Sequence, residues 1–82
     1  MKTRVALIGI IIENTDAVEK INGILHEYRD VIIGRMGVPY REKNVAIISV
    51  CLDAEDDVIN AISGKIGSLQ GVTTKTVYSN VR

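Results

Sequence analysis

The sequence predicts an α+β domain in which two helices lie on one face of a four-stranded antiparallel sheet. Four short segments rich in β-branched residues and two segments with helical apolar spacing occur in the order βαββαβ. The first and third strand segments are apolar at consecutive positions, as expected of strands that are apolar on both faces and central in a sheet.

Residues 4–12, RVALIGIII, form the first predicted strand, and residues 13–30 form the first predicted helix. Asn14, Thr15 and Asp16 can each cap that helix, and Asp16 with Glu19 has the spacing of a capping box. The apolar positions of this segment recur at helical spacing and predict its buried face. They are Ala17, Val18, Ile21, Ile24, Leu25 and Tyr28.

Residues 31–38 predict the second strand, in which Gly34 and Gly37 indicate a bulge or a close backbone contact. Pro39 lacks an N–H group, so the strand is expected to end there. Residues 39–44 then form a polar turn into the third strand at residues 44–53. A connection of this length is typical of a β-hairpin.

Asp53 is expected to cap the second helix, with acidic side chains in the first turn and Gly67 as the C-cap. The predicted buried stripe consists of Val58, Ile59, Ile62 and Ile66. The last strand, residues 72–79, is less hydrophobic and is expected at a sheet edge. This order of elements is typical of the ferredoxin-like sandwich, in which strands one and three are central.

The length, composition and charge of the chain exclude several classes of protein. The chain has 82 residues, 46% hydrophobic and 24% charged, with ten basic and ten acidic side chains, so we expect one domain over residues 1–82. Zero net charge argues against DNA binding by this chain alone. No apolar run reaches the roughly 18 residues of a membrane helix, and no signal-peptide pattern is present. We therefore expect a cytoplasmic protein that does not enter a membrane.

The central strands are apolar on both faces, but two helices cover only one of them. One alternating set holds Val5, Leu7, Gly9 and Ile11, with Val45, Ile47, Ser49 and Cys51 on the third strand. An open face of this kind exceeds what a soluble monomer usually exposes. We therefore predict a homo-oligomer, a dimer or a tetramer, in which a second subunit covers this face. Pairing of the glycine-containing edge strand across an interface is the alternative mode of assembly.

No nucleophile, base and orienting group occur together, so we expect no enzyme, no catalytic residue and no cofactor. HEYRD lacks the second histidine of the HExxH zinc motif, although His26 and Asp30 stand at i, i+4. A single cysteine cannot form a disulfide within one chain. Cys51 lies in an apolar strand, where a buried core thiol is expected. We assign no metal ligand from the sequence.

The segment 34–41 is the most unusual part of the chain. Its candidate motif residues are Gly34, Arg35, Met36, Gly37, Pro39, Tyr40 and Arg41. Arg35, on an expected edge strand, can bind an anion, pair with a carboxylate across an interface, or keep the edge solvated. We expect first that Arg35 contributes to an interface or has a structural role.

Residues 26–54, with residues 5–14 and 64–79, resemble the family of iron-only hydrogenase system regulators, and IIGRMGVPYRE at 32–42 is the most specific part. That family is similar to ACT domains and to the C-terminal domain of nickel-responsive regulators. The resemblance implies an oligomeric ferredoxin-like protein that regulates the assembly or expression of [FeFe]-hydrogenase. This chain departs from those relatives: it has no ribbon-helix-helix segment, no histidine-rich nickel site and no glycine after the first strand.

Three functions follow. The first is an ACT-like module that senses a small-molecule effector at a subunit interface. The resemblance places that ligand-binding site at Glu13, Asn14, Thr15 and Asp16, with Arg35 from a neighbouring subunit. The second is a ligand-free adaptor that binds hydrogenase maturation or transcription proteins. The third is a metal sensor that uses His26 or Cys51 across a symmetry axis.

Overall fold

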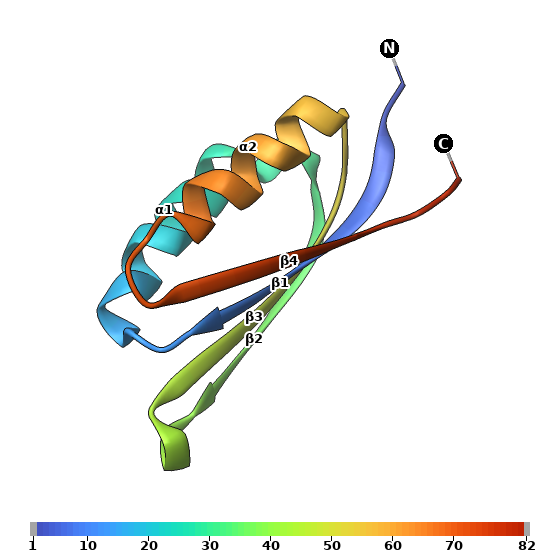
Figure 1. Cartoon of the computed structure of the whole chain (residues 1–82). Helices are drawn as coiled ribbons and strands as arrows, with labels where there is room; N and C mark the ends of the chain where they lie inside the picture. The colour runs from blue at the N-terminus through green and yellow to red at the C-terminus, as the bar shows by residue number, and fades with distance from the viewer. Residues whose placement is uncertain (1, 82) are drawn as a thin grey trace.

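The structure is a computed structural model and describes residues 2–81. The strands and helices are β1 (Arg4–Ile12), α1 (Val18–Glu27), β2 (Ile32–Tyr40), β3 (Val45–Ala54), α2 (Asp56–Gly67) and β4 (Val72–Tyr78). The strands pair antiparallel in the order β2-β3-β1-β4, and both helices lie on one side of the sheet (Figure 1). The predicted ferredoxin-like fold is therefore confirmed.

The two central strands are β1 and β3, as predicted. They pair along their full lengths, from Arg4 opposite Ala54 to Ile12 opposite Ala46. Because side chains alternate along a strand, this register decides which residues face the helices. The buried residues of these strands are Ala6, Ile8, Ile10, Ile12, Ile48, Val50, Leu52 and Ala54. They form the sheet side of the hydrophobic core.

The helix side of that core is formed by apolar residues at positions that the helical periodicity predicts. Ile21 and Leu25 of α1 are buried, and so are Ile59, Ile62 and Ile66 of α2. Within residues 2–81 no polar or charged residue falls in the buried class, so dry aliphatic packing holds the helices to the sheet. No helix of the described chain has both the length and the apolar character needed to cross a bilayer.

The start of α1 differs from the prediction. Asn14 Oδ1 accepts a hydrogen bond from the Asp16 backbone N–H at 3.2 Å and caps a short 3₁₀ turn, Thr15–Ala17. The α-helix begins only at Val18, with no side-chain cap. Asp16 therefore does not form a capping box with Glu19, because the 3₁₀ turn separates the capping residue from the first α-helical turn.

Both predicted caps of α2 are wrong. Asp53 continues β3, and Glu55 takes the N-cap position before the helix begins at Asp56. At the other end Gly67 is still helical, and Ser68 is the C-cap. The acidic first turn is present, with Asp56 and Asp57 where they oppose the helix dipole. Because several residues near each end of α2 can occupy a cap position, the sequence does not determine the exact residue at which the helix begins or ends.

The strand β2 does not end at Pro39 as predicted, but continues to Tyr40 with Pro39 opposite Ala46. An edge strand tolerates a proline because one side of it has no hydrogen-bonded neighbour. The expected irregularity near Gly34 is present as a register shift between Ile32 and Gly34. The β2–β3 hairpin is confirmed and extends beyond the helices (Figure 1).

Candidate functional site

A groove of about 360 Å³ lies between α1 and the helix-facing side of the β2–β3 hairpin. It exists because the helices leave β2 uncovered, and every residue of β2 after Ile32 is exposed. Thr15, Val18 and Asn22 line one wall. The opposite wall consists of Arg35, Gly37, Val38, Pro39, Ala46, Ile47 and Ile48. This volume is within the range of small-molecule sites.

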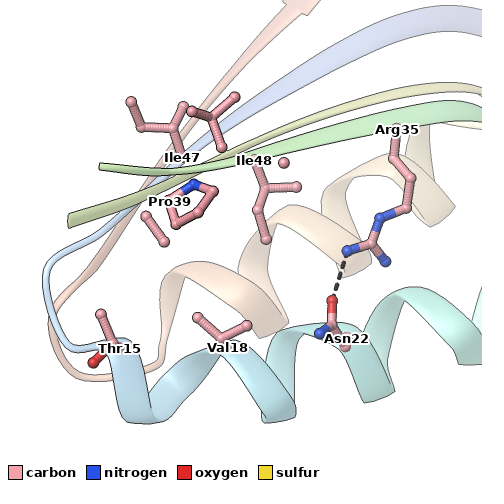
Figure 2. Close-up of a pocket in the computed structure, with 10 residues that line it drawn as sticks. Thr15, Val18, Asn22, Arg35, Pro39, Ile47 and Ile48 are labelled. Atoms are coloured by element: carbon pink, nitrogen blue, oxygen red, sulfur yellow. Dashed lines mark hydrogen bonds between the residues drawn. The ribbon is translucent and has the colours of Figure 1, made fainter. Parts of the chain in front are cut away.

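One polar contact crosses the groove. Arg35 lies opposite Val50 in the sheet register, on the helix side, and its Nη2 donates to Asn22 Oδ1 at 2.6 Å (Figure 2). Within residues 2–81 no carboxylate oxygen lies within 4.0 Å of the Arg35 guanidinium. A guanidinium binds a carboxylate or a phosphate more strongly than a neutral amide. Arg35 therefore keeps unused capacity for an anion.

A second groove, of about 260 Å³, adjoins the first at the Arg35–Asn22 contact, because both residues line both grooves. The further lining residues of this second groove are Leu25, His26, Arg29 and Ile32. Arg29 Nη1 donates to the backbone oxygen of His26 at 2.9 Å, which holds the arginine against the end of α1. The two grooves along α1 thus differ in character: the first, on one side of Arg35, is mainly apolar, and the second, on the other side, is basic.

The four loop residues that were predicted to bind an effector do not line one common cavity in the structure. The Glu13 backbone N–H donates to the Gly71 oxygen at 2.7 Å, which ties the loop to the start of β4. Asn14 and Asp16 line a separate hollow of about 130 Å³. Thr15 reaches the large groove and lines it together with Arg35 of the same chain, which lies at the other end (Figure 2). Glu13, which is exposed, lines neither of these cavities.

The motif at residues 34–41 serves both sides of the sheet. Its groove-lining members are Arg35, Gly37 and Pro39. The alternation along β2 places the other strand members, Gly34, Met36 and Tyr40, on the face away from the helices, opposite Cys51, Ser49 and Val45. Arg41 begins the short 3₁₀ turn at the hairpin tip. The motif therefore borders both the groove and the uncovered face.

The face of the sheet opposite the helices, which we call the open face, is covered by none of the elements within residues 2–81 (Figure 1). Its large apolar side chains are between 39% and 64% exposed, and they are Val5, Leu7, Ile11, Met36, Val38, Tyr40, Ile47 and Val77. Four strands of up to about nine residues span roughly 19 × 30 Å, on the order of 550 Å². The predicted second apolar face is therefore present within the described chain.

Cys51 and His26 lie on opposite sides of the sheet. Cys51, opposite Leu7, is exposed on the open face, so the prediction of a buried core thiol is wrong. An apolar strand has two faces, and this residue belongs to the face without helices. His26 borders the basic groove. In the described part of the chain, no group of three or more His, Cys, Asp or Glu residues is placed to hold a metal ion.

On the helix side of the groove, two lining residues were not singled out from the sequence as site residues. Val18 was assigned to the buried stripe of the helix, and Asn22 stands outside that stripe. The signal that finds them is spacing: Thr15, Val18 and Asn22 stand three and four residues apart and share one face of the helical segment. That face borders β2 rather than the centre of the sheet.

Known proteins share the sequence pattern and the fold of this chain. Residues 4–76 match the model of the TM1266-like family, described as an iron-only hydrogenase system regulator. Uncharacterized protein TM1266 from Thermotoga maritima is 37% identical, with a TM-score of 0.89 over 94% of this chain and 98% of that one.

A more distant structure shares the fold alone. Divalent ion tolerance protein CutA1 from Ehrlichia chaffeensis is 14% identical, with a TM-score of 0.53 over 100% of this chain and 87% of that one. No curated protein is significantly similar in sequence. The family match and the similarity to TM1266 both cover most of the chain. This protein therefore belongs to the TM1266-like family of iron-only hydrogenase system regulators.

Proposed function

We propose that this chain is a non-enzymatic regulatory module that acts as a homo-oligomer and senses a small molecule in an iron-only hydrogenase system. Membership of the TM1266-like family supports the regulatory role. The observation that carries the oligomer is the open face, where eight large apolar side chains are exposed on the strands of one sheet. The groove beside Arg35 supports the sensing role.

The occupant that we propose for the open face is a second copy of the same chain. Its charged residues stand at the margins: Lys75 on the edge strand β4 and Asp53 near the end of β3. Apolar rows with charges of both signs at the edge and the end of the sheet suit a self-complementary interface. The flat area of this face is on the order of 550 Å². Its side chains protrude and add accessible surface, which brings the area that can be buried near the roughly 800 Å² per partner of stable complexes.

The energetics favour association. Covering about 300 Å² of apolar surface on each of two copies, at about 25 cal/mol per Å², contributes on the order of 15 kcal/mol. The loss of translational and rotational freedom opposes this by about 4 to 15 kcal/mol. Complementary packing of the two apolar rows therefore decides the affinity. They are Val38–Ile47–Ile11 and Gly34–Cys51–Leu7–Val77, and they lie on either side of the middle row, Met36–Ser49–Gly9–Lys75.

The experiment combines native mass spectrometry with a thermal-shift screen of amino acids, nucleotides and organic acids. We expect an even oligomer, and at least one compound that raises the melting temperature. A ligand at about 100 times its Kd adds about 2.7 kcal/mol of stability. A monomer at micromolar concentration contradicts the proposed assembly. A screen without any shift contradicts sensing and favours a ligand-free adaptor.

A further inference from the structure

We infer that the two adjoining grooves along α1 form one site for a small organic anion with an apolar tail. The anionic group binds at Arg35, and the tail lies along Val18, Pro39 and Ile48. This inference rests on the proposed sensing function and names the chemical class of its ligand. It is carried by the contrast between the two grooves that meet at the Arg35–Asn22 hydrogen bond.

The head-group end of the site is positive and unneutralised. Arg35, Arg29 and His26 line the same groove, and no carboxylate within residues 2–81 forms an ion pair with either arginine. A guanidinium carries five N–H donors, so Arg35 can keep its bond to Asn22 and still bind an anion through its remaining donors. The present neutral partner is the weaker one for this cation.

The tail end of the site is apolar. Between Thr15 and Asn22 the wall runs for seven residues, on the order of 10 Å at the helical rise per residue. Thr15 stands at the end away from Arg35 (Figure 2), and its hydroxyl makes no hydrogen bond within the described chain. A ligand of matching length therefore places its charge at one end of the groove and its tail at the other.

Gly37 keeps the groove open. It lies opposite Ile48 on the helix-facing side of the sheet, and a Cβ added there would approach Ile48 Cγ1 at 3.8 Å. That distance is an ordinary van der Waals contact, so a side chain at this position fits the strand. It would occupy space that the tail of the ligand needs. The position thus offers a blocking variant with an intact fold.

The test uses three probes with one tail, octanoate, octyl phosphate and octanol, with the purified chain. Affinity is measured by isothermal titration calorimetry, and the site is located by amide chemical-shift changes. We expect at least one anion to bind and to move the amides of Asn22, Arg35 and Gly37. Octanol should bind about tenfold more weakly or worse, since it lacks the charge-assisted hydrogen bonds. The tighter of the two anions identifies the head group.

Three variants locate the interaction. Arg35→Gln should weaken anion binding about tenfold or more, and Gly37→Val should weaken all three probes. Lys43→Gln removes the same charge at the hairpin tip, where Lys43 lines neither groove, and should leave the affinity unchanged. Wild-type affinity in Arg35→Gln, or equal affinity for octanol and octanoate, would overturn the inference. Melting curves of each variant confirm that it is folded.

The result separates this inference from the proposed function. If no octyl probe binds but the screen yields a ligand of another class, the ligand class is wrong and sensing stands. If no compound binds at all, both the inference and the sensing function fail. The oligomeric state, measured on the same samples, tests the open face independently of either outcome.

Discussion

The two faces of one sheet differ although the same strands supply both. On β1, Ile8 and Ile10 are fully buried under the helices, while Leu7 and Ile11 are 41% and 42% exposed on the open face. On this strand the residue types are alike, so its composition does not distinguish the two faces. What differs is the cover, since two helices lie on one side and no element within residues 2–81 lies on the other (Figure 1). The comparison teaches that the same strands supply a core within the chain and, in the assembly that we propose, a second one between two copies.

The largest expected effect is on the helix-covered face. Ile10→Ala leaves a cavity in fully buried packing and should cost about 2 to 5 kcal/mol of unfolding free energy. Denaturation in urea measures it. Val81→Ala is the control, because Val81 is 77% exposed and should change stability by less than about 0.5 kcal/mol. Equal costs for the two variants would contradict the placement of the core.

On the open face the expected effect is on assembly. Leu7→Lys would bury an unpaired charge between two copies, so the dissociation constant should rise about a hundredfold or more while the circular dichroism spectrum is kept. Sedimentation velocity measures the change. Gln70→Lys adds the same charge at an exposed turn and should leave the oligomer intact. An undisturbed oligomer in Leu7→Lys would place the interface elsewhere.

Substitution of a glycine outside both faces should lower folding stability and leave assembly unchanged, which is the opposite of the effect expected for Leu7→Lys. Gly71 has a φ of +76°, and a Cβ there would lie 2.7 Å from Asn14 Cβ. Gly71→Ala should therefore lower the unfolding free energy by about 1 to 3 kcal/mol. Its effect on stability comes from thermal melts, and the subunit number should stay that of the wild type. A melt identical to wild type would show that the turn relaxes without strain.

The smallest expected effect is stabilising. Gly23 lies inside α1 with open space around its missing Cβ. Gly23→Ala should raise the unfolding free energy by about 0.5 to 1 kcal/mol through helix propensity alone. Calorimetry resolves a change of this size. A loss of stability would show that this position packs against a second copy, and would move the interface to the helices.

The sequence predicts most of the fold because its strongest signal is periodic. Consecutive apolar residues in β1 and β3 indicate both the central positions and the second apolar face. The boundaries are less predictable: Asp53 has the residue type of an N-cap but pairs in β3, and Glu55 takes the N-cap position without a side-chain capping hydrogen bond. Cys51 was misplaced since an apolar strand does not say which of its faces the helices cover.

The groove could be predicted only in part. Arg35 and Thr15 stand out in the sequence, but their places at the two ends of one groove depend on how far the edge strand extends past α1. Asn22 contacts Arg35 across thirteen residues through a hydrogen bond that no local pattern indicates. The site therefore follows from tertiary placement, whereas the open face follows from the alternation within single strands.

The most direct test of the central claim is solvent exposure of methyl groups in the wild-type protein. A soluble paramagnetic probe broadens the NMR signals of methyls that water reaches. We predict that Leu7, Ile11 and Ile47 are protected although 39% to 42% of each is exposed in the single chain, whereas Val81 is broadened. Broadening of the three open-face residues as strong as that of Val81 would contradict a second copy on this face.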